Sequence, residues 1–299
     1  MKDYEIFTSS PSDLNREYHA KNGIQCIPFK VIFEDKEVDD DTWQTFSPKE
    51  FYDLIRQGAN PSTSQINVGD YVEHFTPFLE AGKDILHLEL SSGISGSINS
   101  AQIARAELAN RFPERKIYVV DSLCASSGLG LLVDKVVELR DQGKAIDEIY
   151  AFVEEHKLNV QHWFTSMDLT HYFRGGRISR TSFLIGGALN ICPVLNMDYK
   201  GKLTPRKKAR GFKKALNSLV DQMSELAEHR KEYDQKVFIC QSDEEENAQF
   251  VADKIRKTFP YVKEVCIFPI GTTIGSHTGP GTISIFFWGD RRTEDEPKK

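Results

Sequence analysis

Hydroxyl-bearing residues and glycines gather in one turn of the chain, residues 91–97, which reads SSGISGS. An apolar run at residues 85–90 predicts a buried strand before the turn, and the apolar spacing after it predicts a helix. A helix start leaves unpaired backbone N–H groups, and the helix dipole there favours negative charge. With added serine hydroxyls, the turn predicts a binding site for a carboxylate or a phosphate. The alternative is that these serines only cap the helix.

A second chemically suggestive segment, residues 271–281, reads GTTIGSHTGPG and contains His277. An imidazole can hydrogen-bond an anion or transfer a proton. Several glycines and a proline constrain this segment, which indicates a backbone shaped for a ligand rather than a free surface loop. Arg177, in the sequence RGGRIS, could bind a carboxylate or phosphate through two parallel hydrogen bonds, or could lie in a basic surface turn.

A serine esterase is an alternative function for the same residues. Ser95, Asp121 and His277 occur in the chain order of the α/β-hydrolase triad, and Ser95 lies between a predicted strand and a predicted helix. However, GISGS is not the G-x-S-x-G elbow, because its second glycine comes one residue early. The sequence therefore gives this alternative little support.

The elements that must position these residues alternate between strands and helices up to about residue 160. This alternation predicts an α/β fold with a mostly parallel sheet and helices on both faces. Three hydroxyl-rich loops, after Thr8, Leu90 and Asp121, are then expected at the carboxyl edge of the sheet, where ligands bind. Gly128 and Gly130, near the start of a predicted helix, imply close packing against another backbone. The predicted strands of this half are residues 4–8, 24–33, 85–90 and 116–121, and residues 60–65 are expected to be a polar loop.

Beyond residue 160 the order of strands and helices changes, which indicates a separate α+β domain with a mixed or antiparallel sheet. We therefore expect two domains, residues 1–160 and 161–299. The predicted strands here are residues 162–167, 193–197, 235–241, 262–268 and 282–288, and the predicted helices are residues 182–189, 209–229 and 243–259.

Composition narrows the class of protein. The net charge of −6 over 299 residues argues against a general nucleic-acid binder and allows at most a transient contact with a membrane surface. The charged N-terminus lacks the pattern of a signal peptide, and the longest apolar run is too short to span a bilayer. Five scattered cysteines without a C-x-x-C pair indicate a reduced, cytoplasmic protein. We expect no metal site, and no motif supports binding of ATP or NAD.

One basic segment stands out in this acidic chain, because no Asp or Glu occurs between Tyr199 and Val220. Such a run is usually a solvated helix face. The alternative is a docking surface for an acidic protein partner, a nucleotide or lipid head groups. Its basic residues are Lys200, Lys202, Arg206, Lys207, Lys208, Arg210, Lys213 and Lys214.

Taken in order, these segments resemble the DegV family of bacterial fatty-acid-binding proteins over essentially the whole chain. The resemblance implies two α/β domains with a long-chain fatty acid between them and no cofactor. It also implies a protein partner, an ATP-dependent fatty acid kinase that phosphorylates the bound carboxylate to an acyl phosphate. The matching segments are TSQ at 63–65, SSGISGSINSA at 91–101, VVDSLCASSGLGLLV at 119–133, GGRIS at 175–179, the basic stretch 201–214 and IGSHTGPG at 274–281.

Carried over to this sequence, the resemblance implies roles for particular residues. The carboxylate ligands would be Thr63, His277 and a serine of the 91–97 turn, Ser95 before Ser92. Arg177 would lie near the carboxylate and assist phosphoryl transfer, and Arg206 and Arg210 would dock the kinase. On this interpretation the chain alone turns nothing over, and a regulatory lipid-sensing protein is a further alternative.

Two segments depart from the family's usual pattern. The first turn usually reads TDSTADL, whereas residues 8–14 read TSSPSDL, so that Ser9 replaces an acid. In addition, TSQ is followed by Ile66 and Asn67 instead of Pro and Ser. Both departures concern the rim of the N-terminal half.

Overall fold

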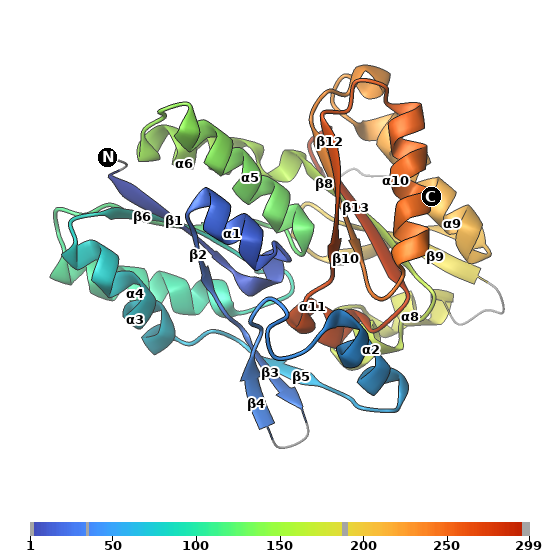
Figure 1. The fold of residues 1–299 in the computed structure, drawn as a ribbon, viewed down its shortest axis with the longest axis horizontal. Helices are drawn as coiled ribbons and strands as arrows, with labels where there is room; N and C mark the ends of the chain where they lie inside the picture. Colours follow the sequence, from blue (N-terminus) through green and yellow to red (C-terminus); the bar gives the residue numbers. More distant parts are fainter. Residues whose placement is uncertain (1–2, 34–35, 187–190, 295–299) are drawn as a thin grey trace.

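The computed structural model describes residues 3–33, 36–186 and 191–294, without the side chains of residues 184–186. Its strands form three sheets, and the two larger ones stand side by side (Figure 1). The chain is therefore an α/β protein with a parallel N-terminal sheet and a mixed C-terminal sheet, as the sequence predicts.

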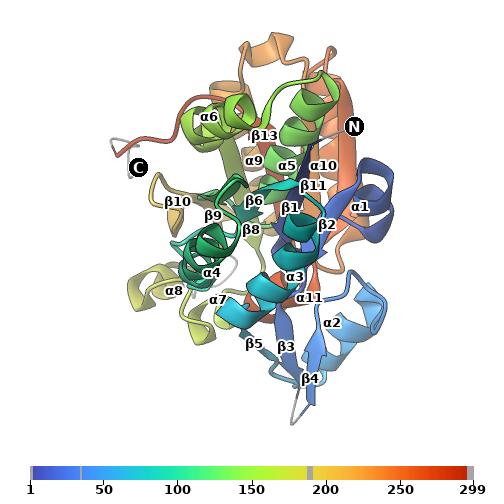
Figure 2. The same ribbon diagram turned by 90° about the vertical axis from the view of Figure 1, so that its left-hand side faces the viewer.

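The N-terminal sheet has the order β2-β1-β6-β7, and each neighbouring pair is parallel. Helices α3 and α4 cover one face and α5 and α6 the other, while α1 lies beside β2 (Figures 1 and 2). Because both faces are covered, the strands read as apolar runs. The bounds are β1 Tyr4–Ser9, β2 Ile24–Ile27, β6 Asp84–Glu89, β7 Ile117–Asp121, α1 Arg16–Asn22, α3 Val68–Glu80, α4 Ser97–Arg111, α5 Ser127–Asp141 and α6 Ile146–His156.

The C-terminal sheet has the order β10-β9-β8-β13-β11-β12, and only its β11–β12 pair is parallel. Helices α9 and α10 pack on one face, and α5 packs on the other. The expected domain boundary near residue 160 remains a prediction; β8 starts there. The bounds are β8 Val160–Ser166, β9 Ile191–Met197, β10 Leu203–Arg210, β11 Lys236–Gln241, β12 Glu264–Pro269, β13 Thr282–Trp288, α7 Thr170–Arg174, α8 Arg180–Gly186, α9 Phe212–Leu226 and α10 Glu245–Thr258.

Helix α5 lies between the two larger sheets and contacts strands of both. Its glycines make this possible: a Cβ at Gly130 would lie 2.7 Å from the Ser12 carbonyl oxygen, and one at Gly128 would lie 2.1 Å from His162 Nε2. The expected close backbone approach is thus confirmed at Gly130, whereas Gly128 makes room for a side chain.

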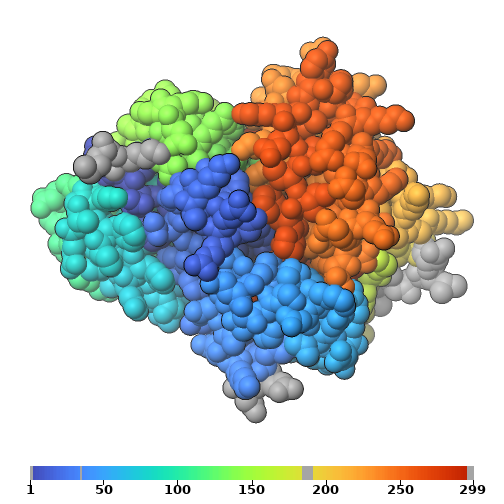
Figure 3. All heavy atoms as spheres, viewed as in Figure 1, coloured from blue at the N-terminus to red at the C-terminus, as the bar shows by residue number. Residues whose placement is uncertain are grey.

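A small antiparallel sheet, β4-β3-β5, belongs to the N-terminal half, and its strands β3 and β5 contact α11 of the C-terminal half. Helix α2, which follows β4, has the predicted Ser47–Glu50 capping box. In Figure 3 the light-blue segment around α2 lies against the C-terminal part of the chain, where Arg56 pairs with Asp243 and the Tyr52 hydroxyl donates to the Ile270 carbonyl at 2.7 Å. The bounds are β3 Lys30–Phe33, β4 Lys36–Asp39, β5 Ser62–Ser64, α2 Pro48–Arg56 and α11 Thr272–Thr278.

Several predicted elements are wrong in detail. The strand expected at 24–33 is interrupted around Pro28, which has no N–H for a ladder, so β2 and β3 belong to different sheets. The polar loop at 60–65 contains β5, because Thr63 pairs with Val31 of β3. The helix expected from residue 209 starts only at Phe212, and the basic run before it is strand β10. The 271–281 loop contains helix α11, and the end of the helix predicted at 182–189 falls outside the described residues.

The buried side chain of Arg292, in the C-terminal segment, ties several loops together. Its guanidinium donates to the carbonyl oxygens of Leu123 and Asp198 at 2.9 and 2.8 Å, and more weakly to that of Lys157 at 3.3 Å. These carbonyls belong to loops of both halves, so Arg292 fixes one half against the other.

Within the described residues, no helix is both long and apolar enough to cross a membrane. All five cysteines are free thiols.

Candidate functional site

A pocket opens where the two larger sheets and α11 meet, and it holds about 740 Å³ of unfilled space including its mouth. Loops at the carboxyl edge of the parallel sheet form one wall, the α5-side face of the mixed sheet forms a second, and α11 forms a third. Most of the exposed surface inside the pocket is apolar, and its apolar lining residues are Phe29, Leu90, Ile94, Ala125, Phe164, Met197, Leu203, Ile270, Ile274 and Phe286. The pocket thus lies at the sheet edge where the sequence places a ligand.

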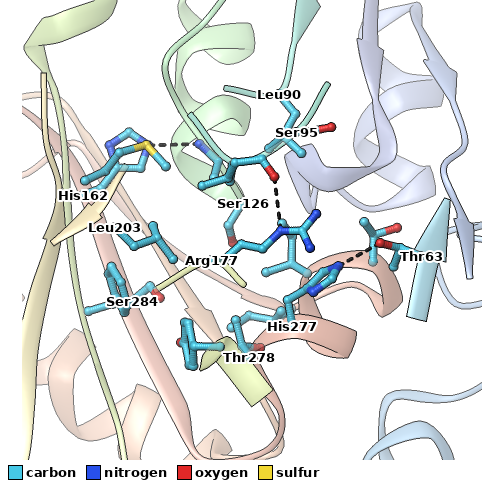
Figure 4. A pocket seen from close by; sticks show the side chains of 18 of the residues that line it. Thr63, Leu90, Ser95, Ser126, His162, Arg177, Leu203, His277, Thr278 and Ser284 are labelled. Atoms are coloured by element: carbon cyan, nitrogen blue, oxygen red, sulfur yellow. Dashed lines mark hydrogen bonds between the residues drawn. The ribbon is translucent and has the colours of Figure 1, made fainter. Parts of the chain in front are cut away.

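One end of the pocket is polar. Thr63 Oγ1 and His277 Nε2 form a 2.7 Å hydrogen bond, although the two residues are 214 positions apart (Figure 4). The guanidinium of Arg177 lies beside them (Figure 4). Its Nε donates to the Ile94 carbonyl at 3.1 Å and its Nη1 to the Gly175 carbonyl at 2.6 Å. Ser95 also lines the pocket. The structure therefore brings four of the sequence-predicted site residues to one pocket.

At the polar end of the pocket, Arg177 carries a positive charge and the His277 ring is neutral. Burial, and then the charge of Arg177, lower the pKa of His277 to about 4. The imidazole is therefore uncharged at neutral pH and can act as a hydrogen-bond partner. Arg177 supplies the positive charge, although burial lowers its pKa from the usual value as well.

The glycines around His277 have packing roles. A Cβ at Gly275 would lie 2.7 Å from the Tyr52 hydroxyl, and one at Gly271 would lie 2.7 Å from Asp13 Oδ1. A Cβ at Gly175 would lie 2.4 Å from His277 Nδ1. These glycines therefore let α11 and its histidine fit between neighbouring elements. The sequence interpretation that they shape the backbone for a ligand stays a prediction.

Substitution of Gly175 tests this fit. We expect Gly175→Ala to push the His277 ring out of its place, since the new methyl group would overlap Nδ1. The Thr63–His277 hydrogen bond should be lost, at a cost of about 1 kcal/mol in stability. Chemical shifts of the His277 ring, measured by NMR, check this result. Gly176→Ala is an unsuitable control because Gly176 has φ +72°, whereas Arg180→Ala changes an exposed side chain that does not line the pocket.

The serines of the 91–97 turn make different contacts. Ser91 Oγ donates to the Gly201 carbonyl at 2.9 Å, which joins the turn to the β9–β10 turn. Ser92 is exposed and does not line the pocket, and its backbone N–H donates to Asp121 at 3.1 Å. Only Ser95 lines the pocket, with its Oγ 3.1 Å from Ser97 Oγ. Of the two serines expected to bind a carboxylate, Ser95 is thus the one at the pocket, and its role stays a prediction.

No hydrolase relay is assembled in the described part of the chain. His277 bonds Thr63, and Ser95 Oγ bonds Ser97. The Asp121 carboxylate instead accepts backbone N–H groups of its own and the neighbouring turn, from Leu123 and Ser92. The residues proposed for an esterase therefore do not form the required sequence of hydrogen bonds.

The two arginines expected to dock a kinase differ in exposure. Arg206 is 9% exposed, and its Nε donates to Asn196 Oδ1 at 2.8 Å, so it is an interior residue. Arg210, at the end of β10, is exposed. Strand geometry explains the difference, since side chains alternate along β10 and a bulge falls between Pro205 and Lys207. A docking role can therefore be considered further for Arg210 only.

Sequence reasoning missed a pair of buried carboxyl groups that hold α11. Asp13 Oδ1 accepts the Gly271 N–H at 2.9 Å, and Asp40 Oδ1 accepts the Thr272 hydroxyl at 2.8 Å. Asp13 also accepts the Ser126 hydroxyl, which lies on the pocket wall. Burial, and the nearby Asp40, raise the pKa of Asp13 to about 8. No sequence signal points to this pairing, because its members come from three separate segments.

The raised pKa of Asp13 predicts a pH effect on stability. The folded protein keeps this proton between an ordinary carboxyl pKa of about 3.9 and about 8, whereas the unfolded chain loses it, so stability falls as pH rises through this range. His19 and His277 act in the opposite direction, but only below about pH 6.5, because their pKa values are lowered to about 4. The free energy of unfolding should fall by about 1–2 kcal/mol less between pH 6.5 and 8 in Asp13→Asn than in the wild type, as measured by urea unfolding. An undiminished decline would contradict this assignment; the exposed Asp3→Asn is the control.

A second buried network stands where the chain departs from the usual family turn. Ser9 Oγ donates to Glu89 Oε1 at 2.9 Å, and the Leu90 N–H donates to the same oxygen at 2.8 Å. Tyr71 and His87 bond Oε2 of Glu89 at 2.7 and 2.8 Å. Glu89 thus provides a carboxyl group next to the position where Ser9 lacks one, and it fixes the start of the 91–97 turn.

A pocket between the two larger sheets, with a mostly apolar surface and one charged end, suits an amphiphilic ligand. The family model described as "Uncharacterised protein, DegV family" matches residues 3–290. This chain belongs to the DegV family. A DegV domain-containing protein of Clostridium perfringens is 40% identical over 292 residues, covering 98% of this chain and 99% of that protein. The fatty acid-binding protein of Thermotoga maritima is 30% identical over 283 residues, covering 93% of this chain and 95% of that protein.

Solved structures share the fold. A DegV family protein of Thermus thermophilus, described for its fatty acid binding, has a TM-score of 0.86 at 27% identity, covering 96% of this chain and 100% of that one. The fatty acid kinase (Fak) B3 protein of Streptococcus pneumoniae, loaded with linoleic acid, has a TM-score of 0.83 at 23% identity, covering 96% of this chain and 99% of that one. Because the Streptococcus pneumoniae protein is only 23% identical, its likeness to this chain shows a shared fold and nothing more.

Proposed function

We propose that this protein binds a long-chain fatty acid, with the carboxylate held by Thr63, Ser95 and His277 and the acyl chain in the apolar pocket. The observation that carries the proposal is the Thr63–His277 hydrogen bond at the charged end of a pocket whose exposed surface is mostly apolar. Fatty acid binding by family members of similar sequence supports it.

The energetics suit a fatty acid. Each CH₂ group removed from water contributes about 0.8 kcal/mol, so a long chain supplies most of the affinity. The polar end then needs only to fix the orientation of the ligand. Arg177, beside His277, adds the positive charge that favours a carboxylate over an uncharged head group.

We propose further that the bound carboxylate is presented to a fatty acid kinase. In this step a carboxylate oxygen attacks the γ-phosphorus of ATP brought by the kinase, the bond to the bridging oxygen breaks, and ADP leaves with that electron pair. Hydrogen bonds from neutral groups hold the carboxylate without removing its charge, so it remains a nucleophile. Arg177 would stabilise the charge of the transferring phosphoryl group. The chain by itself would have no turnover.

The kinase would dock through cations on and beside β10. Lys202, Lys208, Arg210 and Lys214 are exposed, and the structure gives them no ion pair with a described residue. An acidic partner surface would fit these cations and associate faster at low salt. Arg206 is omitted from this surface because it is buried.

The comparison of a fatty acid with the alcohol of equal chain length tests the binding proposal. We expect stearate to bind at least tenfold more tightly than stearyl alcohol in a displacement titration, and Arg177→Met to reduce the difference. Equal affinities would contradict a carboxylate site. If stearate binds but a pull-down with the wild-type protein, in which Lys208 and Arg210 are present, recovers no kinase, a regulatory lipid-sensing function becomes the better account.

A further inference from the structure

A serine hydroxyl on the wall of the pocket has no hydrogen-bond partner among the described residues. Ser284 belongs to β13, lines the pocket and is 6% exposed. Side chains alternate along a strand, so Ser284 and Phe286, which also lines the pocket, point to the same face of the sheet. Ile283 and Ile285 point to the other face and are buried. The Ser284 side chain is therefore directed toward the pocket (Figure 4).

The oxygen atom of Ser284 is open to the interior of the pocket. Within the described part of the chain, the side-chain oxygens that are closed to solvent and also lack a partner are Ser12 Oγ and Thr273 Oγ1. Ser284 Oγ lacks a partner too, but it is not one of these closed atoms, so part of its surface is accessible. Because Ser284 lines the pocket, a water molecule or a polar group of a ligand can reach this oxygen from there.

Two other hydroxyl groups of the pocket lining show the contrast. The Ser126 hydroxyl donates to the Asp13 carboxyl group, and the Tyr172 hydroxyl lies 3.0 Å from Thr282 Oγ1. Both groups are therefore satisfied by the protein itself. Ser284 keeps its hydrogen-bonding capacity for whatever occupies the pocket.

Ser284 lies away from the carboxylate end. Figure 4 shows Thr63 and Ser284 on opposite sides of the pocket, with His277 between them. The β8–β13 register pairs Ser284 with Phe164, and Phe164 and Phe286 both line the pocket. The hydroxyl is thus set among phenyl rings that would contact the acyl chain of the ligand.

The start of helix α5 favours an oxygen atom in this part of the pocket. In the β11–β13 register Ser284 pairs with Cys240, and Cys240 Sγ lies 2.8 Å from the hydroxyl of Ser127, the first residue of α5. Directly paired residues share one face of a sheet, so the helix start adjoins the wall that holds Ser284. A helix start carries partial positive charge, which attracts an electron-rich oxygen.

A plain acyl chain would displace water from Ser284 without replacing its hydrogen bond, which weakens binding. A hydroxyl or keto oxygen on the chain would replace that bond, since a serine hydroxyl both donates and accepts. We propose that Ser284 recognises an oxygen atom on the acyl chain, so that fatty acids with a hydroxyl or keto group at one particular position are the preferred ligands. This inference rests on the proposed function and names the substrate class within it.

Binding of stearate and of 6-, 8-, 10- and 12-hydroxystearate and the matching oxostearates to the full chain tests the proposal. Isomers within a series lose the same hydration on binding, so differences among them report contacts made inside the pocket. We expect one position to bind about tenfold more tightly than the others in at least one series, and at least as tightly as stearate.

Ser284→Ala should abolish the advantage of that position and bind stearate at least as tightly as the wild type. Ser284→Cys, which has a similar shape but a weak hydrogen-bonding group, should reduce the advantage as well, and it serves if the alanine variant does not fold. Thr278→Val is the matched control, because Thr278 also lines the pocket but its Oγ1 contacts the Gly279 carbonyl at 3.3 Å. This variant should keep the advantage.

The inference is overturned if no position stands out in either series, if stearate binds more tightly than every oxygenated acid, or if the advantage persists without the Ser284 hydroxyl. Stearate itself separates the two proposals. If stearate and all the oxygenated acids fail to bind, the proposed function fails as well; if they bind without a preferred position, only this inference fails.

Discussion

Replacement of His277 by alanine is expected to weaken fatty acid binding about 10- to 150-fold, the value of one hydrogen bond to a charged group. The imidazole is neutral at physiological pH because its pKa is lowered to about 4. It therefore acts through a hydrogen bond and not through charge, and the loss should be the same at pH 6 and pH 8. Titration of stearate into wild-type and variant protein at both pH values measures it.

Two further variants sharpen this prediction. Thr63→Val should weaken binding in the same way, and the double variant should lose less than the sum, because Thr63 and His277 are hydrogen-bonded to each other. With a kinase present, acyl phosphate formation should fall in parallel. The exposed His74→Ala is the control. Unchanged stearate affinity in His277→Ala would remove this residue from the carboxylate site.

Arg292→Met should lower the free energy of unfolding by about 3 kcal/mol, since it leaves buried carbonyl groups without donors. Leu123 and Asp198 lose hydrogen bonds of 2.9 and 2.8 Å, and the weaker bonds to Lys157 and Leu158 are lost with them. Urea unfolding provides the measurement. Because the Leu123 loop and the β9–β10 turn adjoin the pocket, fatty acid binding should weaken as well.

The adjacent Arg291→Met is a close control. Arg291 is exposed and donates to the Glu155 carbonyl at 2.6 Å, so its loss should change stability by about 0.5 kcal/mol or less. Equal effects of the two substitutions would show that Arg292 does not hold the two halves together.

The regular parts of the fold could be predicted from sequence because local patterns determine them. Buried parallel strands such as β6 and β7 give apolar runs, and the capping box at Ser47 marks the start of α2. The basic strand β10 could not be recognised in this way. Its pairing with β9 and its bulge are tertiary features, and its lysines and arginines favour a helix as readily as a strand.

The site was predictable to the extent that its residues lie in recognisable segments. Thr63, Ser95, Arg177 and His277 come from four such segments, and all of them line one pocket. Asp13 and Asp40 lie 27 positions apart and contact α11 only through the fold, so no local pattern reveals them.

The central claim, that the pocket holds a fatty acid, is tested most directly by mass spectrometry of the lipids extracted from protein purified from a bacterial host. We predict a fatty acid in near-equal amount to the wild-type protein. It should be largely absent from a folded Leu203→Trp variant, in which the larger side chain would occupy the pocket. Wild-type protein that is repeatedly free of fatty acid, or an equal amount in the blocked variant, would contradict the account.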